Sequence, residues 1–531
     1  MSERIINEII SGKTSLGIEL GSTRIKAQLV DKNAVLIASG DFEWENQLID
    51  GIWTYSDKDI WAGIQATFSN LKADVKKQYN VELNKIGSIG FSAMMHGYLA
   101  FDKNDSLLVP FRTWRNATTE VAAKELTEIF NFNIPQRWSI AHLYQAMLDG
   151  EDHVSEITYF TTLAGYVHWK LTGEKVLGIG DASGMFPIDD KLKDYDQDMI
   201  NKFDLLVKEN GYNFKLRNLL PKSLQAGVCA GQLTKEGALL LDPTGDLKDG
   251  IPFAPAEGDA GTGMVATNSI TPNTGNLSAG TSVFAMIVLE NQLSKVYPEI
   301  DMVTTPDGHS VAMVHVNNCT SEINAWVSLF GDLLDKMGVT YKTSDLYEKL
   351  FNSALEADED DFGNLVYGYH SGENITNLPE GRPLLVRMPN AKFDIANLMR
   401  AQIESAFATL NIGMQTLFNE GIKIESIVGH GGIFKTKDVA QKIVAAAVES
   451  SVTLMDTASE GGAWGMALLS QYVLEDDSLS LREFLNKKVF FNTKTLKYTP
   501  TEKEILRFRK FVEKYEKGLK IEVTAVKNFK G

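Results

Sequence analysis

Two strand-turn-strand patterns, about half a chain apart, constrain the fold of this sequence more than any other feature. The first occupies residues 16–30 and turns at Gly21-Ser22-Thr23, and the second occupies residues 276–288 and turns at Gly280-Thr281-Ser282. In both patterns apolar strands flank a turn of glycine and small hydroxyl residues, which leaves backbone N–H groups open to an anion. A repeat of this kind predicts two duplicated halves that face each other across a cleft.

The length of the chain supports the same division. A single hydrophobic core stops growing at about 250 to 300 residues, so a chain of 531 residues is expected to form two large domains. Between the repeats the sequence alternates predicted strands (15–31, 33–44 and 86–92) with a predicted helix at 57–80, which is an α/β order. We therefore expect two α/β domains, 1–258 and 259–531, with a central cleft.

The later part of the chain contains a second α/β run. Residues 394–420 have the apolar spacing of a long amphipathic helix, and a strand at 424–428 and the glycine-rich turn at 429–433 follow. A strand that leads into such a turn offers N–H groups to phosphate or lets a flat ring lie against the main chain. The tail from Thr501 to about Lys517 is predicted as a charged helix that stops at Gly518.

Charge and cysteine content narrow the classes of function. The formal net charge of −17 excludes a sequence-independent grip on nucleic acid or on an anionic membrane. The two cysteines, Cys229 and Cys319, are far apart and predict a reducing, cytoplasmic location without disulfides. Acidic residues near Met1 argue against a signal peptide, and the uncharged stretch 260–289 is too polar to span a membrane.

Asp259 is the strongest single candidate for chemistry. It enters the stretch from Ala260 to Leu289, which contains no charged side chain, so it stands as an isolated carboxylate among glycine, threonine, serine and alanine. Such a carboxylate is well suited to act as a general base. The competing interpretation is an aspartate in an ordinary glycine turn.

Motifs in a fixed order over nearly the whole chain resemble the FGGY carbohydrate kinases, which share the actin-like, ribonuclease H-like fold. The order and spacing of the motifs carry the resemblance, since no single motif is specific. The motifs are LGIELGST (16–23), SAMMHGYLAFD (92–102), GDASG (180–184), GQLTKEG (231–237), EGDAGTGM (257–264), SAGTS (278–282), MRAQIESAFATL (399–410), GGIFKT (431–436) and EGGAWGMAL (460–468).

The resemblance implies an enzyme that transfers the γ-phosphoryl group of ATP, with Mg²⁺, to a sugar hydroxyl. It makes Asp259 the catalytic base and Glu19 the residue that meets hydrated Mg²⁺, although the family usually has aspartate at the position of Glu19. It assigns sugar binding to the N-terminal domain and the nucleotide to the C-terminal domain. The residues implied to hold the nucleotide are Gly21, Ser22, Thr23, Gly280, Thr281, Ser282, Gly431 and Gly432.

For the sugar, the resemblance points to Met95, His96 and Gly97, with Asp259 beside the reacting hydroxyl. This triplet is most similar to xylulokinases, whereas Gly431-Gly432-Ile433 is equally similar to ribulokinases. Trp114 and Asn116 are further candidates, because a tryptophan can wall a sugar face and an asparagine can bridge two hydroxyls. The expected substrate is a ketopentose, first D-xylulose and then L-ribulose or another ketose or polyol.

Two other classes stay open from the sequence. One is an actin-like ATPase that acts as a switch or scaffold, which would not need a sugar base at Asp259. The other is a sugar-binding relative with weak catalysis, which the glutamate at position 19 keeps in consideration. A homodimer is expected only from the family, and neither nucleic acid nor membrane is expected as a partner.

Overall fold

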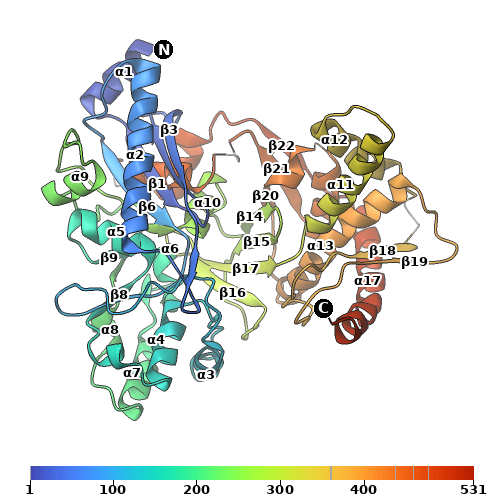
Figure 1. Ribbon diagram of the computed structural model, residues 1–531, viewed down its shortest axis with the longest axis horizontal. Helices are drawn as coiled ribbons and strands as arrows, with labels where there is room; N and C mark the ends of the chain where they lie inside the picture. Colours follow the sequence, from blue (N-terminus) through green and yellow to red (C-terminus); the bar gives the residue numbers. More distant parts are fainter. Residues whose placement is uncertain (1, 359–361, 437, 458–459, 476–477, 531) are drawn as a thin grey trace.

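A mixed β-sheet forms the centre of each of two lobes (Figure 1) in a computed structural model that describes residues 2–358, 362–436, 438–457, 460–475 and 478–530. The first sheet has the strand order β13-β6-β1-β2-β3. Strands β1, β2 and β3 form an antiparallel meander, and β6 and β13 continue the sheet parallel to β1. The bounds are β1 (Ser15–Leu20), β2 (Arg24–Val30), β3 (Leu36–Glu43), β6 (Ser88–Ala93) and β13 (Glu257–Gly258).

The second sheet has the order β16-β17-β15-β14-β20-β21-β22. Its inner part again joins an antiparallel run, β17-β15-β14, to two parallel strands, β20 and β21. The bounds are β14 (Thr274–Ala279), β15 (Val283–Val288), β16 (Ile300–Thr304), β17 (Ser310–Val316), β20 (Ser426–His430), β21 (Ser451–Met455) and β22 (Thr495–Tyr498). The repeated arrangement confirms two duplicated α/β halves.

Helices cover both faces of the first sheet. Helix α2 (Asp57–Tyr79) packs on β3, and its predicted apolar positions, from Ile60 to Val75, are buried. Helix α15 (Gly462–Tyr472), from the far end of the chain, packs on β1. A Cβ added at Gly17 would lie 2.2 Å from the Ala463 carbonyl oxygen, so only glycine permits this approach. Helix α15, although it follows most of the second lobe in the sequence, therefore belongs to the first lobe.

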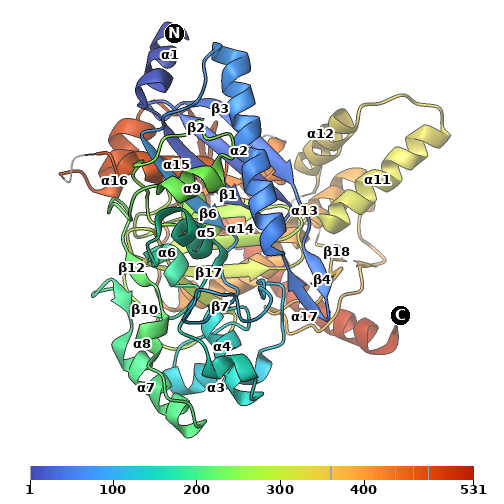
Figure 2. The same ribbon diagram turned by 60° about the vertical axis from the view of Figure 1, so that its left-hand side comes forward.

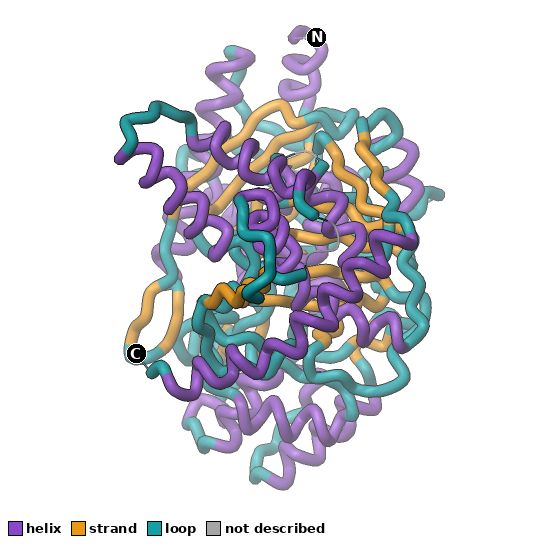
Figure 3. The backbone as a smooth tube through the Cα atoms, turned by 90° about the vertical axis from the view of Figure 1, so that its right-hand side faces the viewer, coloured by secondary structure: helices purple, strands orange, loops and turns teal. Residues whose placement is uncertain are grey.

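In Figure 3, which faces the second lobe, helices lie in front of the strands. The predicted helix at 394–420 is α13 (Ile395–Asn419), with Asp394 as its N-cap. Helix α17 runs from Glu502 to Asn528, so the expectation that it stops at Gly518 is wrong. Gly518 instead makes room for a neighbour, because an added Cβ would lie 1.9 Å from the Tyr367 hydroxyl oxygen.

The other elements surround these two centres, and Figure 2 shows α3, α7 and α8 at the end of the first lobe opposite α1. None of the described helices is both long and apolar enough to cross a membrane. Both cysteines are free. The remaining bounds are α1 (Ser2–Ser11), β4 (Gln47–Ile49), β5 (Ile52–Thr54), β7 (Leu99–Phe101), α3 (Glu120–Phe130), α4 (Ser139–Leu148), β8 (Tyr159–Thr161), α5 (Leu163–Thr172), β9 (Val176–Gly178), α6 (Ile179–Ala182), β10 (Ile188–Asp189), β11 (Asp194–Tyr195), α7 (Gln197–Glu209), α8 (Leu216–Leu219), β12 (Lys222–Leu224), α9 (Lys235–Leu241), α10 (Asp259–Ala266), α11 (Ser321–Lys336), α12 (Thr343–Ser353), β18 (Asn364–Tyr367), β19 (Leu384–Arg387), α14 (Val439–Ala447) and α16 (Leu481–Phe484).

Candidate active site

Three segments of the candidate site follow the ends of neighbouring parallel strands in the first sheet. Leu20 at the end of β1 and Gly258 at the end of β13 both lie beside Ala93 at the end of β6. The turn at 21–23, the turn at 95–97 and Asp259 therefore start from one edge of the sheet. The carboxyl edge of parallel strands is where α/β proteins place their ligands.

Asp259 is the first residue of α10, and its carboxylate faces the turn that follows β6. Asp259 Oδ1 accepts the N–H of Ala260 at 2.9 Å and the N–H of Met95 at 3.3 Å. The residue is exposed to solvent, whereas the two residues before it are buried. Protein encloses the carboxylate on its other sides, and this desolvation is the largest cause that raises the pKa of Asp259.

The long uncharged stretch after Asp259 predicted an isolated carboxylate, but other carboxyl groups lie near it, which corrects that expectation. Glu19 on β1 and Asp181 on α6 interact electrostatically with Asp259, and Glu257 on β13 lies two residues before it. The Thr162 hydroxyl donates to Asp181 Oδ2 at 2.6 Å, and the Asp181 N–H donates to Glu257 Oε2 at 3.0 Å. The first lobe thus gathers four carboxyl groups at one edge of its sheet.

The crowding of these acids changes their ionisation. Burial, followed by the negative charge of Asp259, raises the pKa of Glu19 to about 7. Burial also raises the pKa of Asp181 to about 7, although the Thr162 hydrogen bond lowers it. Burial and the charge of Asp181 raise the pKa of Glu257 well above its ordinary value. Such shifts are typical of functional sites because like charges in a cleft favour a cation or a shared proton.

The predicted sugar-binding triplet forms a tight turn beside Asp259. His96 and Gly97 have positive φ angles, 72° and 85°. The His96 ring is buried, stacks on Trp138 at a centroid distance of 6.3 Å and has Nδ1 3.2 Å from the Gly184 carbonyl oxygen. Burial lowers the pKa of His96 to about 3, so the ring is neutral at physiological pH. Because the carbonyl only accepts, Nδ1 carries the proton and Nε2 is left as an acceptor.

The first hairpin turn is held from behind by aromatic residues. Trp44 Nε1 donates to the Gly21 carbonyl at 2.7 Å, and the Trp44 N–H donates to the Thr23 carbonyl at 3.2 Å. The Tyr55 hydroxyl donates to the Ser22 carbonyl at 2.6 Å, and the two rings stack with centroids 4.1 Å apart. All three carbonyl groups of the turn are therefore taken. The Gly21 N–H is used as well, since it donates to the Arg24 carbonyl at 3.0 Å, so the hydroxyl groups and the N–H groups of Ser22 and Thr23 are left for a ligand.

The second hairpin turn is fixed in a different way. Cys319 N–H donates to the Thr281 carbonyl at 2.9 Å, and Thr320 donates to the Gly280 carbonyl through its N–H at 3.1 Å and its hydroxyl at 2.8 Å. These donors come from the segment that starts α11. Gly431 packs against the same hairpin, because an added Cβ would lie 2.2 Å from the Ala279 carbonyl oxygen. The second turn, Gly431 and the exposed Gly432 are thus neighbours.

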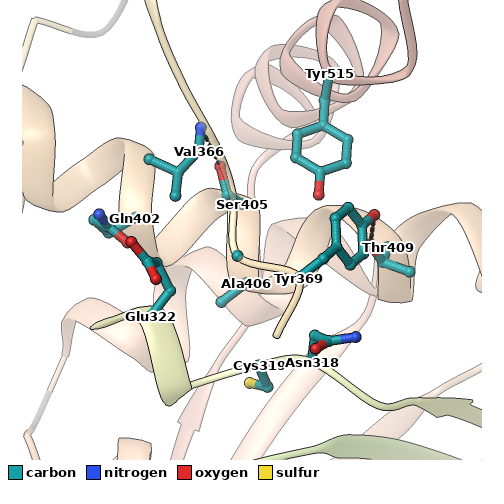
Figure 4. Close-up of a pocket in the computed structure, with 11 residues that line it drawn as sticks. Asn318, Cys319, Glu322, Val366, Tyr369, Gln402, Ser405, Ala406, Thr409 and Tyr515 are labelled. Atoms are coloured by element: carbon teal, nitrogen blue, oxygen red, sulfur yellow. Dashed lines mark hydrogen bonds between the residues drawn. The ribbon is translucent and has the colours of Figure 1, made fainter. Parts of the chain in front are cut away.

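A small cavity lies behind the second turn (Figure 4). Asn318, Cys319 and Glu322, from the segment that starts α11, line one side, and α13 contributes Gln402 and Thr409. Its volume of about 10 Å³ is room for about one water molecule, so it cannot take a nucleotide base.

Trp114 and Asn116 lie on the loop that faces β5. Trp114 is 40% exposed. Asn116 is buried, and its amide is used within the protein, since Oδ1 accepts the N–H of Trp53 at 2.9 Å and Nδ2 donates to the Trp53 carbonyl at 2.8 Å. Asn116 therefore ties its loop to β5, and a contact between its amide and a sugar stays a prediction.

Sequence reasoning missed several residues of this region. Asp181 stands in the GDASG motif but was given no role, and Glu257 directly precedes the Gly-Asp pair at 258–259. Arg137 also acts on the site, because its charge lowers the pKa of both Asp259 and His96. The motif around Asp181 was a usable signal, whereas nothing near Arg137 in the sequence points to Asp259.

Comparisons with known proteins agree with this architecture. Residues 14–266 match the N-terminal domain and residues 275–473 the C-terminal domain of the FGGY family of carbohydrate kinases. The xylulose kinase of Haemophilus influenzae is 22% identical over 513 residues, which cover 94% of this chain and 98% of that protein.

Solved structures of similar proteins show the same fold. The ligand-bound xylulose kinase from Lactobacillus acidophilus superposes with a TM-score of 0.77 at 18% identity and covers 97% of this chain and 98% of that one. The ADP-bound glycerol kinase from Plasmodium falciparum gives 0.72 at 14% identity, with 96% and 98% covered. The two lobes therefore have the actin-like fold, and the chain belongs to the FGGY family of carbohydrate kinases, as an ATP-dependent sugar kinase.

Proposed function

We propose that this kinase phosphorylates the terminal hydroxyl of a ketopentose, with D-xylulose as the leading substrate. One observation carries the proposal: the Asp259 carboxylate accepts the N–H of Met95 and so lies directly beside the Met95-His96-Gly97 turn. A base is thereby next to the turn that we assign to the sugar. The named similarity to xylulose kinases favours a ketopentose, and glycerol kinases among the relatives make a polyol the second choice.

In this mechanism Asp259 accepts the proton of the sugar hydroxyl. The hydroxyl oxygen then forms its bond to the γ-phosphorus, the bond from that phosphorus to the β-phosphate oxygen breaks, and ADP leaves. His96 offers Nε2 as an acceptor to a second sugar hydroxyl, and Met95, Gly97 and Trp114 shape the rest of the sugar site. Closure of the two lobes over the sugar would limit water as a competing acceptor.

The two hairpin turns grip the phosphates from opposite lobes in this proposal. Gly21-Ser22-Thr23 and Gly280-Thr281-Ser282 present their hydroxyl groups and the N–H groups of these hydroxyl residues, because the glycine N–H groups and the turn carbonyls are used within the protein. Gly431 and Gly432 lie beside the adenosine, where the main chain is open enough for a flat ring. Such donors neutralise phosphate charge without a lysine loop.

The residues fit a magnesium ion held mainly through water. Burial, followed by the negative charge of Asp259, raises the pKa of Glu19 to about 7, and a divalent cation would relieve the repulsion between the two carboxylates. No described group of three or more His, Cys, Asp or Glu is arranged as a metal cage. Mg²⁺ commonly uses one or two carboxylates together with substrate phosphates, and bound there it would offset the charge of the transferring phosphoryl group. Glu19 is the residue that would hold it.

The proposal is tested by ADP release with a panel of D-xylulose, L-ribulose, other ketoses and polyols. A ketopentose kinase shows turnover that depends on the sugar and is fastest with D-xylulose or L-ribulose. An actin-like ATPase would hydrolyse ATP at the same rate without sugar. If turnover is fastest with glycerol or another polyol, the ketopentose assignment is wrong but the assignment as a kinase stands.

A further inference from the structure

An ion pair joins the two lobes close to the proposed base. Arg137, in the loop before α4, contacts Asp301 on β16 through Nη2 and Oδ2. Asn133 in the same loop donates to the Ile300 carbonyl at 2.9 Å and to Asp301 Oδ1 at 3.3 Å. The side chains of Arg137 and Asp301 are 26% and 14% exposed, so the pair is partly buried between the lobes and still reached by solvent.

The loop that carries Arg137 is also tied to the proposed sugar turn. The Gly97 N–H donates to the Arg137 carbonyl at 3.2 Å, and the Ser139 hydroxyl donates to the Gly97 carbonyl at 2.5 Å. Between them Trp138 stacks on the His96 ring. The guanidinium is within electrostatic reach of the base, since its charge lowers the pKa of Asp259 and of His315 on β17. One loop thus contacts the sugar turn and places a cation near Asp259.

We propose that Arg137 and Asp301 form a specificity filter that admits uncharged sugars beside Asp259 and rejects sugar acids. This inference rests on the proposed function and names the charge of the acceptor. A guanidinium–carboxylate pair can donate to one sugar hydroxyl and accept from its neighbour. A sugar acid would bring a further negative charge toward Asp259, while the cation that could receive it is already paired with Asp301.

The test replaces Asp301 by asparagine, which has the same shape and keeps an oxygen for Asn133 but frees the charge of Arg137. The values of kcat/KM are measured for D-xylulose and for D-xylonate, a five-carbon sugar acid. We expect D301N to lower the ratio of kcat/KM for D-xylulose to kcat/KM for D-xylonate by about tenfold or more. The reason is that the freed guanidinium of Arg137 can form a charge-assisted hydrogen bond with the xylonate carboxylate. We expect R137Q to raise KM for D-xylulose about tenfold without a gain in xylonate use.

A second contact between the lobes supplies the control. Lys193 Nζ donates to the Gly308 carbonyl at 2.5 Å in the turn between β16 and β17. Neither residue shares a hydrogen bond with the Asp259 side chain, whose partners are Met95 and Ala260. K193M removes this contact, so it reports a general loosening of the lobes and should leave the xylulose-to-xylonate ratio unchanged. If D301N changes the ratio no more than K193M does, the pair is structural and the filter is wrong.

A binding measurement separates this inference from the proposed function. D-xylonate is titrated into wild type and D301N in the presence of MgADP by calorimetry. Tighter binding by D301N supports the filter even if the wild type turns over no ketopentose, an outcome that would remove the proposed function alone. Equal binding by the two proteins, together with normal ketopentose turnover, removes the filter and keeps the function.

Discussion

The two hairpin turns have the same place in their sheets but are secured by different groups. Side chains hold the first turn, because Trp44 and Tyr55 reach its carbonyls from the segments around the β4–β5 hairpin. At the second turn the main chain of Cys319 and Thr320 provides most of the donors. The two turns thus have the same place in their sheets, but side chains stabilise the first and mainly backbone N–H groups stabilise the second.

The surroundings of the two turns differ in charge as well. The first turn lies at the edge where Glu19, Asp181, Glu257 and Asp259 gather, whereas the stretch around the second turn, from Ala260 to Leu289, contains no charged side chain. An uncharged, glycine-rich surface suits a ligand that brings its own negative charge. Carboxylates suit proton transfer and a cation. This difference supports our proposal that acid–base chemistry belongs to the first lobe and nucleotide contact to the second.

The largest effect should come from Asp259→Asn, which removes the proposed base and keeps its shape. We expect kcat with D-xylulose to fall about a thousandfold while KM for ATP changes little, because general base catalysis typically contributes 10²- to 10⁴-fold. Steady-state kinetics check this. Asp246→Asn, an exposed aspartate paired with Lys72, is the matched control and should keep normal activity. If an Asp259→Asn protein folds normally and has the parental kcat, Asp259 is not the general base, and the assignment of acid–base chemistry to the first lobe is wrong.

The nucleotide side is tested by two neighbouring glycines. Gly431 has a φ of 109° and its added Cβ would meet the Ala279 carbonyl at 2.2 Å, whereas an added Cβ at Gly432 meets no atom within 4 Å. We expect Gly431→Ala to cost about 2 kcal/mol or more and to raise KM for ATP, since both the backbone angle and the hairpin contact are strained. Gly432→Ala should leave the free energy of unfolding nearly unchanged, so any rise in its KM for ATP would come from contact with the nucleotide alone. Thermal unfolding measures the stability of the two variants, and steady-state kinetics measure their KM for ATP. Equal stability and equal KM for ATP in the two variants would contradict the role given to Gly431.

The carboxyl cluster of the first lobe predicts a pH dependence of stability. The pKa of Asp181 is raised to about 7 in the folded protein, so folding favours its protonated form. This contribution to the free energy of unfolding is full below the ordinary aspartate range and is lost as pH rises through about 7. Relative to Asp181→Asn, the wild type should lose roughly 2 kcal/mol between about pH 5 and about pH 7. Urea unfolding of both proteins at the two pH values measures this difference in the free energy of unfolding. If the difference is the same at both pH values, the pKa of Asp181 is not raised in the folded protein.

The sequence predicted the fold better than the chemistry of the site. Periodicity found the meander, α2 and α13 because these depend on local patterns, and the repeat found the duplicated halves. It misjudged Gly518, whose reason is contact with Tyr367, more than a hundred residues away in the chain. For the same reason it treated Asp259 as isolated, since Glu19 and Asp181 are distant in the sequence and approach it only in the folded protein. The domain boundary after residue 258 and the roles of the site residues stay predictions.

The smallest effect should distinguish how the two turns are held. Tyr55→Phe deletes the hydroxyl that donates to the Ser22 carbonyl and keeps the ring stacked on Trp44. Thr320→Val deletes the hydroxyl that donates to the Gly280 carbonyl, but the Thr320 N–H still donates to the same oxygen. We therefore expect KM for ATP to rise about fivefold for Tyr55→Phe, near the 1 kcal/mol of an ordinary hydrogen bond, and less than twofold for Thr320→Val. KM for the sugar should stay constant in both variants. The reverse order would mean that the second turn depends on its side chain more than the first does, because a retained main-chain donor should blunt the loss of the hydroxyl.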